Sequence, residues 1–587
     1  MKFTADFETS TWQVDQTFVW AFALCEIGNE DNIIIGNNID DFMKYVEHLP
    51  NSEIYFHNLK FDGEFIIHYL LTHGFTHITN KKERKDRTFT TLISDMGMFY
   101  SIEVYFKVWN KKDKKVKFID SLKIIPFGVE QIAKSFGLPI SKLEIDYNEP
   151  RELGHILTKE ETDYITNDVK IVAMALDLLF KEGLTKITTA SNALANYKET
   201  IGNNKFDELF PQLDYEIDKD IRQAYKGGFT FLNKIYKEID TGAGIVLDVN
   251  SLYPSVMRYE LMPIGEPVFY NGKYEEDNTY PLYIQMITCS FKLKKDKIPT
   301  IQIKKSPSFM DNEYLENSNN EIVCLTLTNI DLKLFLDQYD TEYLNYECGW
   351  KFKGMHGLFD SYIDHWTDVK IKATKEGNKG MRTLAKLMLN SLYGKFAASM
   401  DGQSKIPYLE DDTVLYMLGE EERRKGVYLP MGCFITAYAR DKTIRTSQAI
   451  KTYSIEKYGK DLYCYSDTDS IHTLLPIEEL TQFCDIDDVR LGAWKHESSF
   501  SKARFVRQKT YLEMIDGEIK ITCAGMPKEC YKYVEWDKFK EGFTCSGKLM
   551  FKHVKGGVKL VETDFTIKSD KTLVKNVLAF WYILCYN

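Results

Sequence analysis

The stretch Leu462-Tyr463-Cys464-Tyr465-Ser466-Asp467-Thr468-Asp469-Ser470-Ile471-His472-Thr473-Leu474-Leu475 places two carboxylates one residue apart between apolar flanks. This pattern predicts two short strands joined by a tight turn. Aspartate is a frequent turn former, so a solvated hairpin tip would explain the pair. A cation site would explain it equally well, and acids elsewhere in the chain have to decide between the two interpretations.

A further acid stands at the end of an apolar run. Asp248 follows Ile245-Val246-Leu247 and precedes the segment 249–255, which contains Tyr253 and Pro254. A carboxylate at the end of a buried strand is costly unless it is compensated, and a metal ion would compensate it. The alternative is a helix cap before a helix that starts at Pro254.

A shared site requires Asp248 to face Asp467 and Asp469 across adjacent strands. Its ligands would then be mostly oxygen atoms, which favour Mg²⁺ or Mn²⁺ over zinc. One ion would activate a primer hydroxyl, and the other would bind a triphosphate and neutralise its leaving pyrophosphate. Tyr253 would form a wall beside Asp248.

The first part of the chain holds another set of acids on separate elements. The strand predicted at 3–8 puts Asp6 and Glu8 on one face. Asp62 opens a predicted helix together with Asn58. The helix predicted at 158–180 puts Tyr164 and Asp168 on one face. Four such carboxylates could hold two divalent cations about 4 Å apart for phosphodiester hydrolysis, although a helix cap or a solvated position explains each acid alone.

A basic stripe is predicted on the segment 382–396, read as one helix. The stripe consists of Arg382, Lys386, Asn390 and Tyr393. It suits a triphosphate, with the ring against a base or sugar. A solvated face with snorkelling cations is the alternative, but it leaves the asparagine and the tyrosine unexplained. Lys370 would add to the same cationic group.

Length and composition set outer bounds. The 587 residues predict three to five domains. The net charge of −11 disfavours a nucleic-acid binder, yet phosphate contacts depend on local clusters such as 81–87 and 111–117. Eleven cysteines without a CxxC pair predict reduced thiols rather than disulfides or a zinc ribbon. We expect no signal peptide and no membrane span, because no apolar run reaches about 20 residues.

The pattern of elements predicts an α/β and α+β multidomain chain. Strands and helices alternate over the first 185 residues or so, with a short strand at 54–57, a helix from Asp62 and a hairpin at 102–119. The remaining expectations are many short strands at 260–357, helices at 358–397, a polar loop at 398–426, a helix at 436–453, and a strand-rich end with a turn at Gly556-Gly557.

Taken together, eight motifs resemble the family B DNA polymerases, specifically the protein-primed kind of φ29-type bacteriophages. The likeness runs from Ala5 to about Lys568. Three segments resemble the exonuclease motifs: 6–9, 55–62 and 164–168. Three resemble polymerase motifs A, B and C: 248–254, 386–394 and 465–470. The YxGG element corresponds to 225–228, and the KxY motif to 509–511.

The resemblance implies a ribonuclease H-like 3′→5′ exonuclease domain followed by a right-hand polymerase with two insertions. The expected divisions are 1–187 exonuclease, 188–259 palm, 260–357 first insertion, 358–397 fingers, 398–426 second insertion, 427–528 palm, 529–568 thumb and 569–587 an extension. The first insertion would contact a terminal protein, and the second would support processivity and strand displacement.

Residue roles are carried over by position. The expected metal ligands are Asp6, Glu8, Asp62, Asp168, Asp248, Val249 through its carbonyl, and Asp469. The expected catalytic residues also include Asp467, Lys509, Tyr164, which would orient water, and Lys142. The expected nucleotide contacts are Tyr253 as a steric gate, Lys370, Arg382, Lys386, Asn390 and Tyr393. The expected DNA contacts are Thr9, Asn58, Phe61, Ser121, Leu122, Tyr225, Gly227, Gly228, Ser251, Lys509 and Tyr511.

The implied activity is DNA-directed DNA synthesis that replicates a linear viral genome, primed by a protein hydroxyl and combined with 3′→5′ proofreading. It would use two Mg²⁺ ions per active site, with Mn²⁺ as a substitute. The expected partners are primer-template DNA, single-stranded 3′ ends, deoxynucleoside triphosphates and a terminal protein, in the cytoplasm of an infected bacterium. Apart from the heterodimer with terminal protein we expect a monomer.

Two rivals are weaker. A non-catalytic replication scaffold has no need to keep all seven carboxylates, and an ordinary primer-dependent repair polymerase lacks the two insertions.

Two places depart from the family pattern. The stretch 370–386 is a few residues longer, which leaves the equivalence of Lys370 open. The segment 569–587 extends past the usual end, as a packed element, an interfacial anchor or a reading-frame accident.

Overall fold

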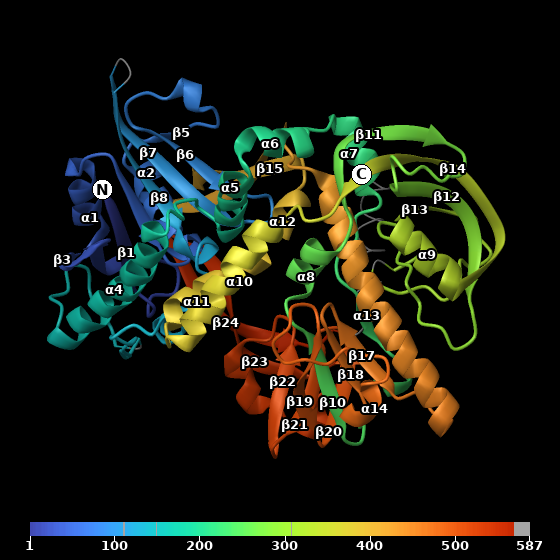
Figure 1. Ribbon diagram of the computed structural model, residues 1–587. Helices are drawn as coiled ribbons and strands as arrows, with labels where there is room; N and C mark the ends of the chain where they lie inside the picture. Colours follow the sequence, from blue (N-terminus) through green and yellow to red (C-terminus); the bar gives the residue numbers. More distant parts are fainter. Residues whose placement is uncertain (110–111, 148, 307, 311, 569–587) are drawn as a thin grey trace, which may run out of the picture.

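The computed structural model describes residues 1–568 except 110–111, 148, 307 and 311. Residue 111 of the second basic cluster and the extension 569–587 therefore lie outside the described residues. The part that is described contains six β-sheets with helices around and between them (Figure 1).

An eight-stranded sheet organises the N-terminal unit, with the order β3-β2-β1-β4-β8-β7-β6-β5. Its strands are β1 Lys2–Thr9, β2 Val19–Glu26, β3 Asn29–Gly36, β4 Ser52–Phe56, β5 Thr76–His77, β6 Thr88–Ile93, β7 Phe99–Trp109 and β8 Lys112–Asp120. Its helices are α1 Ile39–His48, α2 Leu59–Thr72, α3 Val129–Phe136 and α4 Lys159–Lys181. The predicted strand 3–8, the hairpin 102–119 and the helix 158–180 are confirmed.

The helix expected from Asp62 begins three residues earlier, at Leu59. Asn58 precedes it with a left-handed backbone (φ 81°), a conformation that asparagine tolerates better than most residues. The chain therefore turns at Asn58, and Asp62 lies in the first turn of α2.

Alternation along β1 separates two packing layers. Phe3, Ala5 and Phe7 pack in one core with residues of α1 and α2. The Thr4 hydroxyl points the other way and donates to the Val169 carbonyl of α4 at 2.8 Å. Because side chains alternate along a strand, Asp6 and Glu8 face the α4 layer.

A five-stranded sheet lies at the bottom of the view in Figure 1, with the order β19-β10-β18-β17-β9. Its strands are β9 Thr230–Leu232, β10 Gly244–Val249, β17 Tyr463–Asp467, β18 Ser470–Thr473 and β19 Trp494–Phe500. The hairpin predicted at 462–475 is confirmed as β17 and β18. Beside this sheet lie α8 Leu252–Tyr259, α13 Leu429–Tyr458 and α14 Ile477–Leu480.

Two helix boundaries near this sheet differ from expectation. The helix α8 starts at Leu252, two residues before Pro254. The helix predicted at 436–453 is longer at both ends. It starts at Leu429, with Pro430 in its first turn, and ends before Gly459, whose φ is 63°.

The segment 260–357 forms a four-stranded sheet, β11-β14-β12-β13. Its elements are β11 Met262–Asn271, β12 Leu282–Leu293, β13 Val323–Thr328, α9 Asn329–Gln338 and β14 Tyr339–Met355. The expectation of many short strands is wrong, since β14 alone has 17 residues. Gly265 and Pro267 are residue types that often end a strand. Here they lie where the β11–β14 register shifts, so the strand continues through a β-bulge at these two residues.

Helices connect these sheets. They are α5 Thr189–Ile201, α6 Asn203–Leu209, α7 Tyr215–Arg222, α10 Asp360–Lys375, α11 Lys379–Ser391 and α12 Tyr393–Phe396. The segment 382–396 is not one helix, because it breaks at the buried Leu392 between α11 and α12. Gly394, a poor helix former, lies two residues after Leu392, within α12.

The polar loop expected at 398–426 is instead a β-hairpin, β15 Asp401–Glu410 and β16 Thr413–Arg423. Its turn is Asp411-Asp412, and both residues have positive φ, as type I′ turns require. The abundance of charged residues concealed the strand pattern. The Tyr416 hydroxyl reaches the N-terminal unit and donates to Glu64 of α2 at 2.8 Å.

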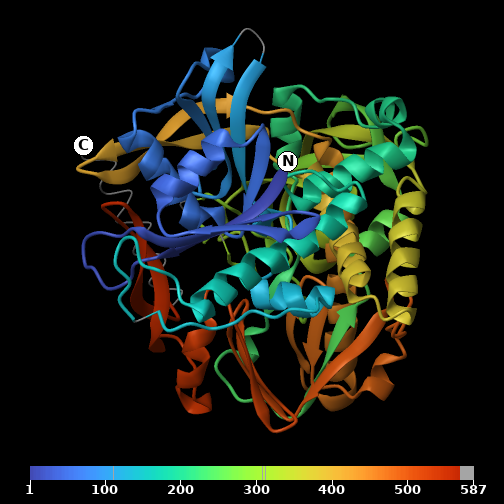
Figure 2. The same cartoon turned by 90° about the vertical axis from the view of Figure 1, so that its left-hand side faces the viewer.

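A second hairpin from the C-terminal part also contacts the N-terminal unit: β23 Thr544–Val554 and β24 Gly557–Thr566. The turn predicted at Gly556-Gly557 is confirmed. Gly556 packs against the Thr17 carbonyl, where a Cβ would come within 2.0 Å, and Gly557 packs against Phe65. Figure 2 shows this red hairpin and the orange β15–β16 hairpin beside the blue N-terminal sheet.

The remaining three-stranded sheet consists of β20 Lys502–Arg507, β21 Thr510–Ile515 and β22 Glu518–Cys523. The ten cysteines within the described ranges are free thiols. Among the helices of the described part, none combines the length and the apolar character needed to cross a membrane.

Candidate active sites

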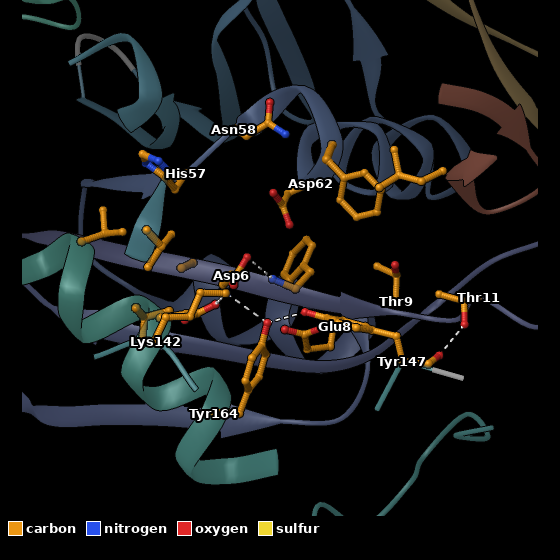
Figure 3. Close-up of a pocket in the computed structure, with 18 of the residues that line it drawn as sticks. Asp6, Glu8, Thr9, Thr11, His57, Asn58, Asp62, Lys142, Tyr147 and Tyr164 are labelled. Carbon is orange, nitrogen blue, oxygen red and sulfur yellow. Dashed lines mark hydrogen bonds and ion pairs between the residues drawn. The ribbon is translucent and has the colours of Figure 1, made fainter. Parts of the chain in front are cut away.

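Four acids of the N-terminal unit come together beside β1. We call Asp6, Glu8, Asp62 and Asp168 the N-terminal cluster. Asp6 and Glu8 face α4, which carries Asp168, while Asp62 points from α2 toward β1 (Figure 3). Glu8, Asp62 and Asp168 are each less than a tenth exposed. The structure thus assembles the four acids predicted from three separate elements.

Burial dominates the electrostatics of this cluster. Together with the Asp168 charge, it raises the pKa of Asp6 to about 7. Burial and the neighbouring Asp6 charge also hold the pKa values of Glu8 and Asp62 well above their ordinary range. One carboxyl oxygen of Asp62 and one of Asp168 are buried without a hydrogen-bond partner. Such groups require a compensating positive charge.

Lys142 and Tyr164 lie where the sequence predicted them. The Lys142 ammonium contacts Asp168 and donates to the Tyr164 hydroxyl at 3.1 Å. The Tyr164 hydroxyl also meets the hydroxyl of Tyr147, which the sequence analysis missed (Figure 3). Tyr147 lies in the irregular segment before α4, where no periodic pattern could have singled it out.

A cavity of about 570 Å³ opens beside the N-terminal cluster. Three of the predicted single-strand contacts line it: Thr9, Asn58 and Phe61. Ser121 and Leu122 are not among its lining residues. Ser121 is fully buried, and its hydroxyl donates to the Phe56 carbonyl at 3.0 Å.

The hairpin β23–β24 closes one side of this cavity with Leu549, Phe551 and Leu560. The Phe551 ring lies 6.2 Å from the Phe61 ring, centroid to centroid. His57 is a further lining residue that the sequence analysis did not select. Phe61 and Phe551 are 490 residues apart, so no local pattern relates them.

The second set of acids meets on the five-stranded sheet. We call Asp248, Asp467 and Asp469 the central cluster. β18 pairs with both β10 and β17, so Ser470 stands opposite Asp248 on one side and Asp467 on the other. The Val249 amide donates to the Asp469 carbonyl at 2.8 Å. This is the adjacency that the sequence required for a shared site.

The central cluster is less buried than the N-terminal one. Burial, followed by repulsion from Asp469, raises the pKa of Asp248 to about 6. The Lys509 ammonium bonds both carboxylate oxygens of Asp467 at 2.7 and 2.8 Å. A second ammonium, on Lys495 of β19, lies 3.3 Å from Asp248 and was not predicted.

The Tyr225-Lys226-Gly227-Gly228 loop supports the turn of the central cluster. Thr468, at φ 58°, packs so closely on Gly228 that a Cβ there would come within 2.5 Å of its hydroxyl oxygen. Arg440 of α13 donates to the carbonyls of Lys226 and Gly227 at 2.6 and 2.8 Å. Close packing against Thr468 therefore explains why position 228 is a glycine, and it places the loop beside the acids of the central cluster.

The basic stripe of α11 is exposed as predicted at Arg382, Lys386 and Asn390. The ring of Tyr393, at the start of α12, stacks on Tyr253 with centroids 3.9 Å apart. Lys370 lies on α10, which packs against α11, and belongs to the same cationic group. Burial lowers its pKa, and repulsion from Arg382 and Lys386 lowers it further. The structure thus places Lys370 beside the stripe whatever its equivalent in relatives.

An opening of about 400 Å³ adjoins the central cluster. Tyr511 and Lys509 line it, whereas Ser251 precedes α8 with a left-handed backbone (φ 53°). Glu497 and the buried pair of His472 and Glu513 also line the opening, and none of the three was predicted as a site residue. Which face of a sheet a Glu or His side chain occupies depends on the strand register, which the sequence alone does not give.

Both clusters suit hard cations. Their donors are carboxylate oxygens, the ligands that Mg²⁺ and Mn²⁺ prefer, and the acids raise one another's pKa values. Within the ranges described, no three Asp, Glu, His or Cys side chains are already set as a metal-binding group. In this structure Asp168, Asp467 and Asp248 each form an ion pair with a lysine ammonium group.

Comparisons with known proteins agree with this architecture. Residues 48–475 match the family "DNA polymerase type B, organellar and viral". The DNA polymerase of Bacillus phage Nf is 46% identical, over 96% of this chain and 99% of that protein. The DNA polymerase of Bacillus phage phi29 is 44% identical over the same shares.

A solved structure shows the same likeness in three dimensions. Phi29 DNA polymerase, complexed with primer-template DNA and incoming nucleotides, matches with a TM-score of 0.90 at 42% identity. The match covers 97% of this chain and all of that one. The chain therefore belongs to the family B DNA polymerases of the organellar and viral type, and within them to the DNA polymerases of φ29-type bacteriophages.

Proposed function

We propose that this polymerase replicates a linear viral genome by protein-primed, strand-displacing synthesis and proofreads with a 3′→5′ exonuclease. The observation that carries the proposal is the division of seven acids into two clusters on different sheets. Each cluster has its own opening, with one lysine at the N-terminal cluster and two at the central cluster. Two separate reactions on DNA fit this division better than one.

Synthesis belongs to the central cluster. Asp248 and Asp469, with the Val249 carbonyl, would hold two Mg²⁺ or Mn²⁺ ions, and Asp467 lies beside them. The bound ions would lower the pKa of the attacking hydroxyl and neutralise charge on the leaving pyrophosphate. Lys509 lies at the Asp467 side together with Tyr511, which suits the primer end.

The incoming nucleotide fits between this cluster and the basic stripe. Arg382, Lys386 and Asn390 would meet its triphosphate, together with Lys370. The stacked pair of Tyr253 and Tyr393 offers a flat wall for the sugar and base. In this position Tyr253 would exclude a ribose 2′-hydroxyl. The primer-template DNA and nucleotides bound by the phi29 enzyme support the same ligands here.

Strand degradation belongs to the N-terminal cluster. Asp6, Glu8, Asp62 and Asp168 would hold two further divalent ions, and Tyr164 with Lys142 would orient a water molecule. Thr9, Asn58 and Phe61 would hold the single-stranded end, the last by stacking on a base. The phi29 enzyme has been solved with single-stranded DNA, which supports such a ligand here.

Protein priming is proposed from the two segments inserted into the polymerase. The four-stranded sheet of 260–357 offers a surface for a terminal protein, and the hairpin of 398–426 would enclose DNA during strand displacement. Together with the phage relatives, this indicates work in the cytoplasm of an infected bacterium. Apart from the terminal-protein heterodimer the enzyme would act as a monomer.

The decisive test supplies candidate terminal protein, template ends and labelled dATP with Mg²⁺. We expect a covalent protein–nucleotide adduct that disappears when Asp469 is changed to Asn. Synthesis from a DNA primer without any adduct would leave a polymerase but contradict protein priming. A matched reaction with the Asp6→Ala, Glu8→Ala double variant should still form the adduct.

A further inference from the structure

The strand register of the five-stranded sheet places the Lys495 ammonium at the central cluster. Lys495 stands directly opposite Asp248 in the antiparallel β10–β19 pair. Residues opposite each other in such a pair project from the same face, so both side chains lie on the side of the acids. Its ammonium lies 3.3 Å from an Asp248 oxygen.

Two lysines bracket the acids of the central cluster. The strand order β19-β10-β18-β17 places Lys495 at the Asp248 end of the row and Lys509 at the Asp467 end. Lys509 is held at two carboxylate oxygens, and its own amide donates to the Tyr465 hydroxyl at 2.8 Å. Lys495 holds one oxygen and keeps a third of its side chain exposed. The Lys495 ammonium is therefore held by fewer and longer contacts than that of Lys509, although the Lys509 side chain is the more exposed.

The Lys495 ammonium also acts on Lys370, the cation beside the basic stripe. Burial lowers the pKa of Lys370, and repulsion from Arg382, Lys386 and Lys495 lowers it further. The Lys495 ammonium therefore lies close enough to Lys370 of α10 to repel it. Like charges converge without an anion between them only at a cost, so the arrangement suits a polyanion.

We propose that Lys495 is a nucleotide-binding residue of the polymerase site, which contacts the triphosphate of the incoming deoxynucleotide and then the departing pyrophosphate. The inference rests on the proposed role of the central cluster in synthesis. Lys495 pairs with Asp248 while that carboxylate has no other cation. Once Asp248 holds a metal ion, its pairing with Lys495 is redundant, and the flexible ammonium can turn toward the phosphates that enter beside it.

The test compares Lys495→Met, which keeps length but removes charge, with Lys495→Arg and the surface control Lys234→Ala. Lys234 pairs only with the exposed Glu316 in the described structure. We expect Lys495→Met to raise the dNTP KM and the inhibition constant of pyrophosphate about tenfold, the effect of one charge-assisted contact, with kcat little changed. Lys495→Arg should recover most of the affinity, and Lys234→Ala should match the parent.

A binding measurement separates this role from others. Calorimetric titration of dATP with Ca²⁺, onto enzyme with a dideoxy-terminated primer-template, should show the same tenfold loss in Lys495→Met. Unchanged nucleotide affinity with an increased Mg²⁺ requirement would overturn the proposal and leave Lys495 a counter-charge of Asp248 alone. Weaker primer-template binding with unchanged KM would overturn it in favour of a DNA contact. Synthesis that persists in Asp469→Asn would instead refute the role of the central cluster itself.

Discussion

The two acid clusters solve the same electrostatic problem in different ways. The N-terminal cluster sets four carboxylates around a deep cavity, where the Lys142 ammonium contacts one of them. The central cluster sets three carboxylates on an open sheet face, with an ammonium at each end of the row. Burial consequently raises the pKa of Asp6 to about 7, whereas that of Asp248 reaches about 6.

This difference teaches which site depends more on its cations. A buried carboxylate that lacks a counter-charge is strongly destabilised in its ionised form. If the proposed function holds, the N-terminal cluster would therefore need divalent ions both for its chemistry and to keep its acids ionised. The central cluster has lysines that supply such a counter-charge to Asp248 and Asp467.

The largest expected effect comes from the central cluster. Changing Asp469 to Asn should abolish synthesis, a loss of at least about a thousandfold, because a ligand position and a charge are removed together. Degradation of single strands should persist. Primer extension and 3′-end degradation, measured on one preparation, check this, and loss of both activities would contradict the separation of the clusters.

The reciprocal change tests the other side. Replacing Asp6 and Glu8 by Ala should reduce degradation by a similar factor while synthesis remains within about twofold of the parent. The measurement is release of nucleotides from a labelled single strand. Parental degradation in this variant would show that the N-terminal cluster does not cut DNA.

A pH titration sharpens the comparison. A protonated acid has to release its proton before it binds a metal ion. At limiting Mg²⁺ we therefore expect the rate of degradation to fall as the pH is lowered through about 7, following Asp6. The rate of synthesis should fall as the pH is lowered through about 6, following Asp248. Rate profiles of both activities from pH 5 to 9 measure the two midpoints, and coincident midpoints would contradict the difference in burial.

The stability of the metal-free protein should change with pH in a defined direction. Because folding raises the pKa of Asp6 from 3.8 to about 7, the folded state binds more protons in this window. Stability is therefore present at low pH and is lost as pH rises toward 7. Asp6→Asn should flatten this decline in melting scans with EDTA from pH 5 to 8, and a decline as steep as in the parent would exclude Asp6 as its source.

The smallest expected effect concerns how the β15–β16 hairpin is attached to the N-terminal unit. Tyr416→Phe removes the hydroxyl that donates to the buried Glu64, which should weaken this attachment by about 1–3 kcal/mol. Protease cleavage within 401–423 should become faster. Tyr408→Phe on the same hairpin is the matched control, since the Tyr408 hydroxyl has no hydrogen bond within the described structure. Equal cleavage rates would exclude the Glu64 contact as an anchor.

Local patterns predicted the elements that carry the acids. Alternation identified β1, and helical spacing identified α4 and the pairing of Tyr164 with Asp168. The 462–475 hairpin was predicted because its strands and turn are adjacent in sequence. By contrast, the 401–423 hairpin was missed, since few of its residues are fully buried and its sequence lacks a clear apolar alternation.

The sequence by itself determined the chemical types at both sites: acids on strands and helices, and a basic stripe on a helix, while the family resemblance added a lysine beside each set of acids. Only the tertiary structure decided which of them meet. Lys495 reaches Asp248 through sheet register, and Phe551 reaches Phe61 across 490 residues of chain. Local preference acts over a few residues, whereas these contacts depend on how whole sheets pack, so no short pattern encodes them.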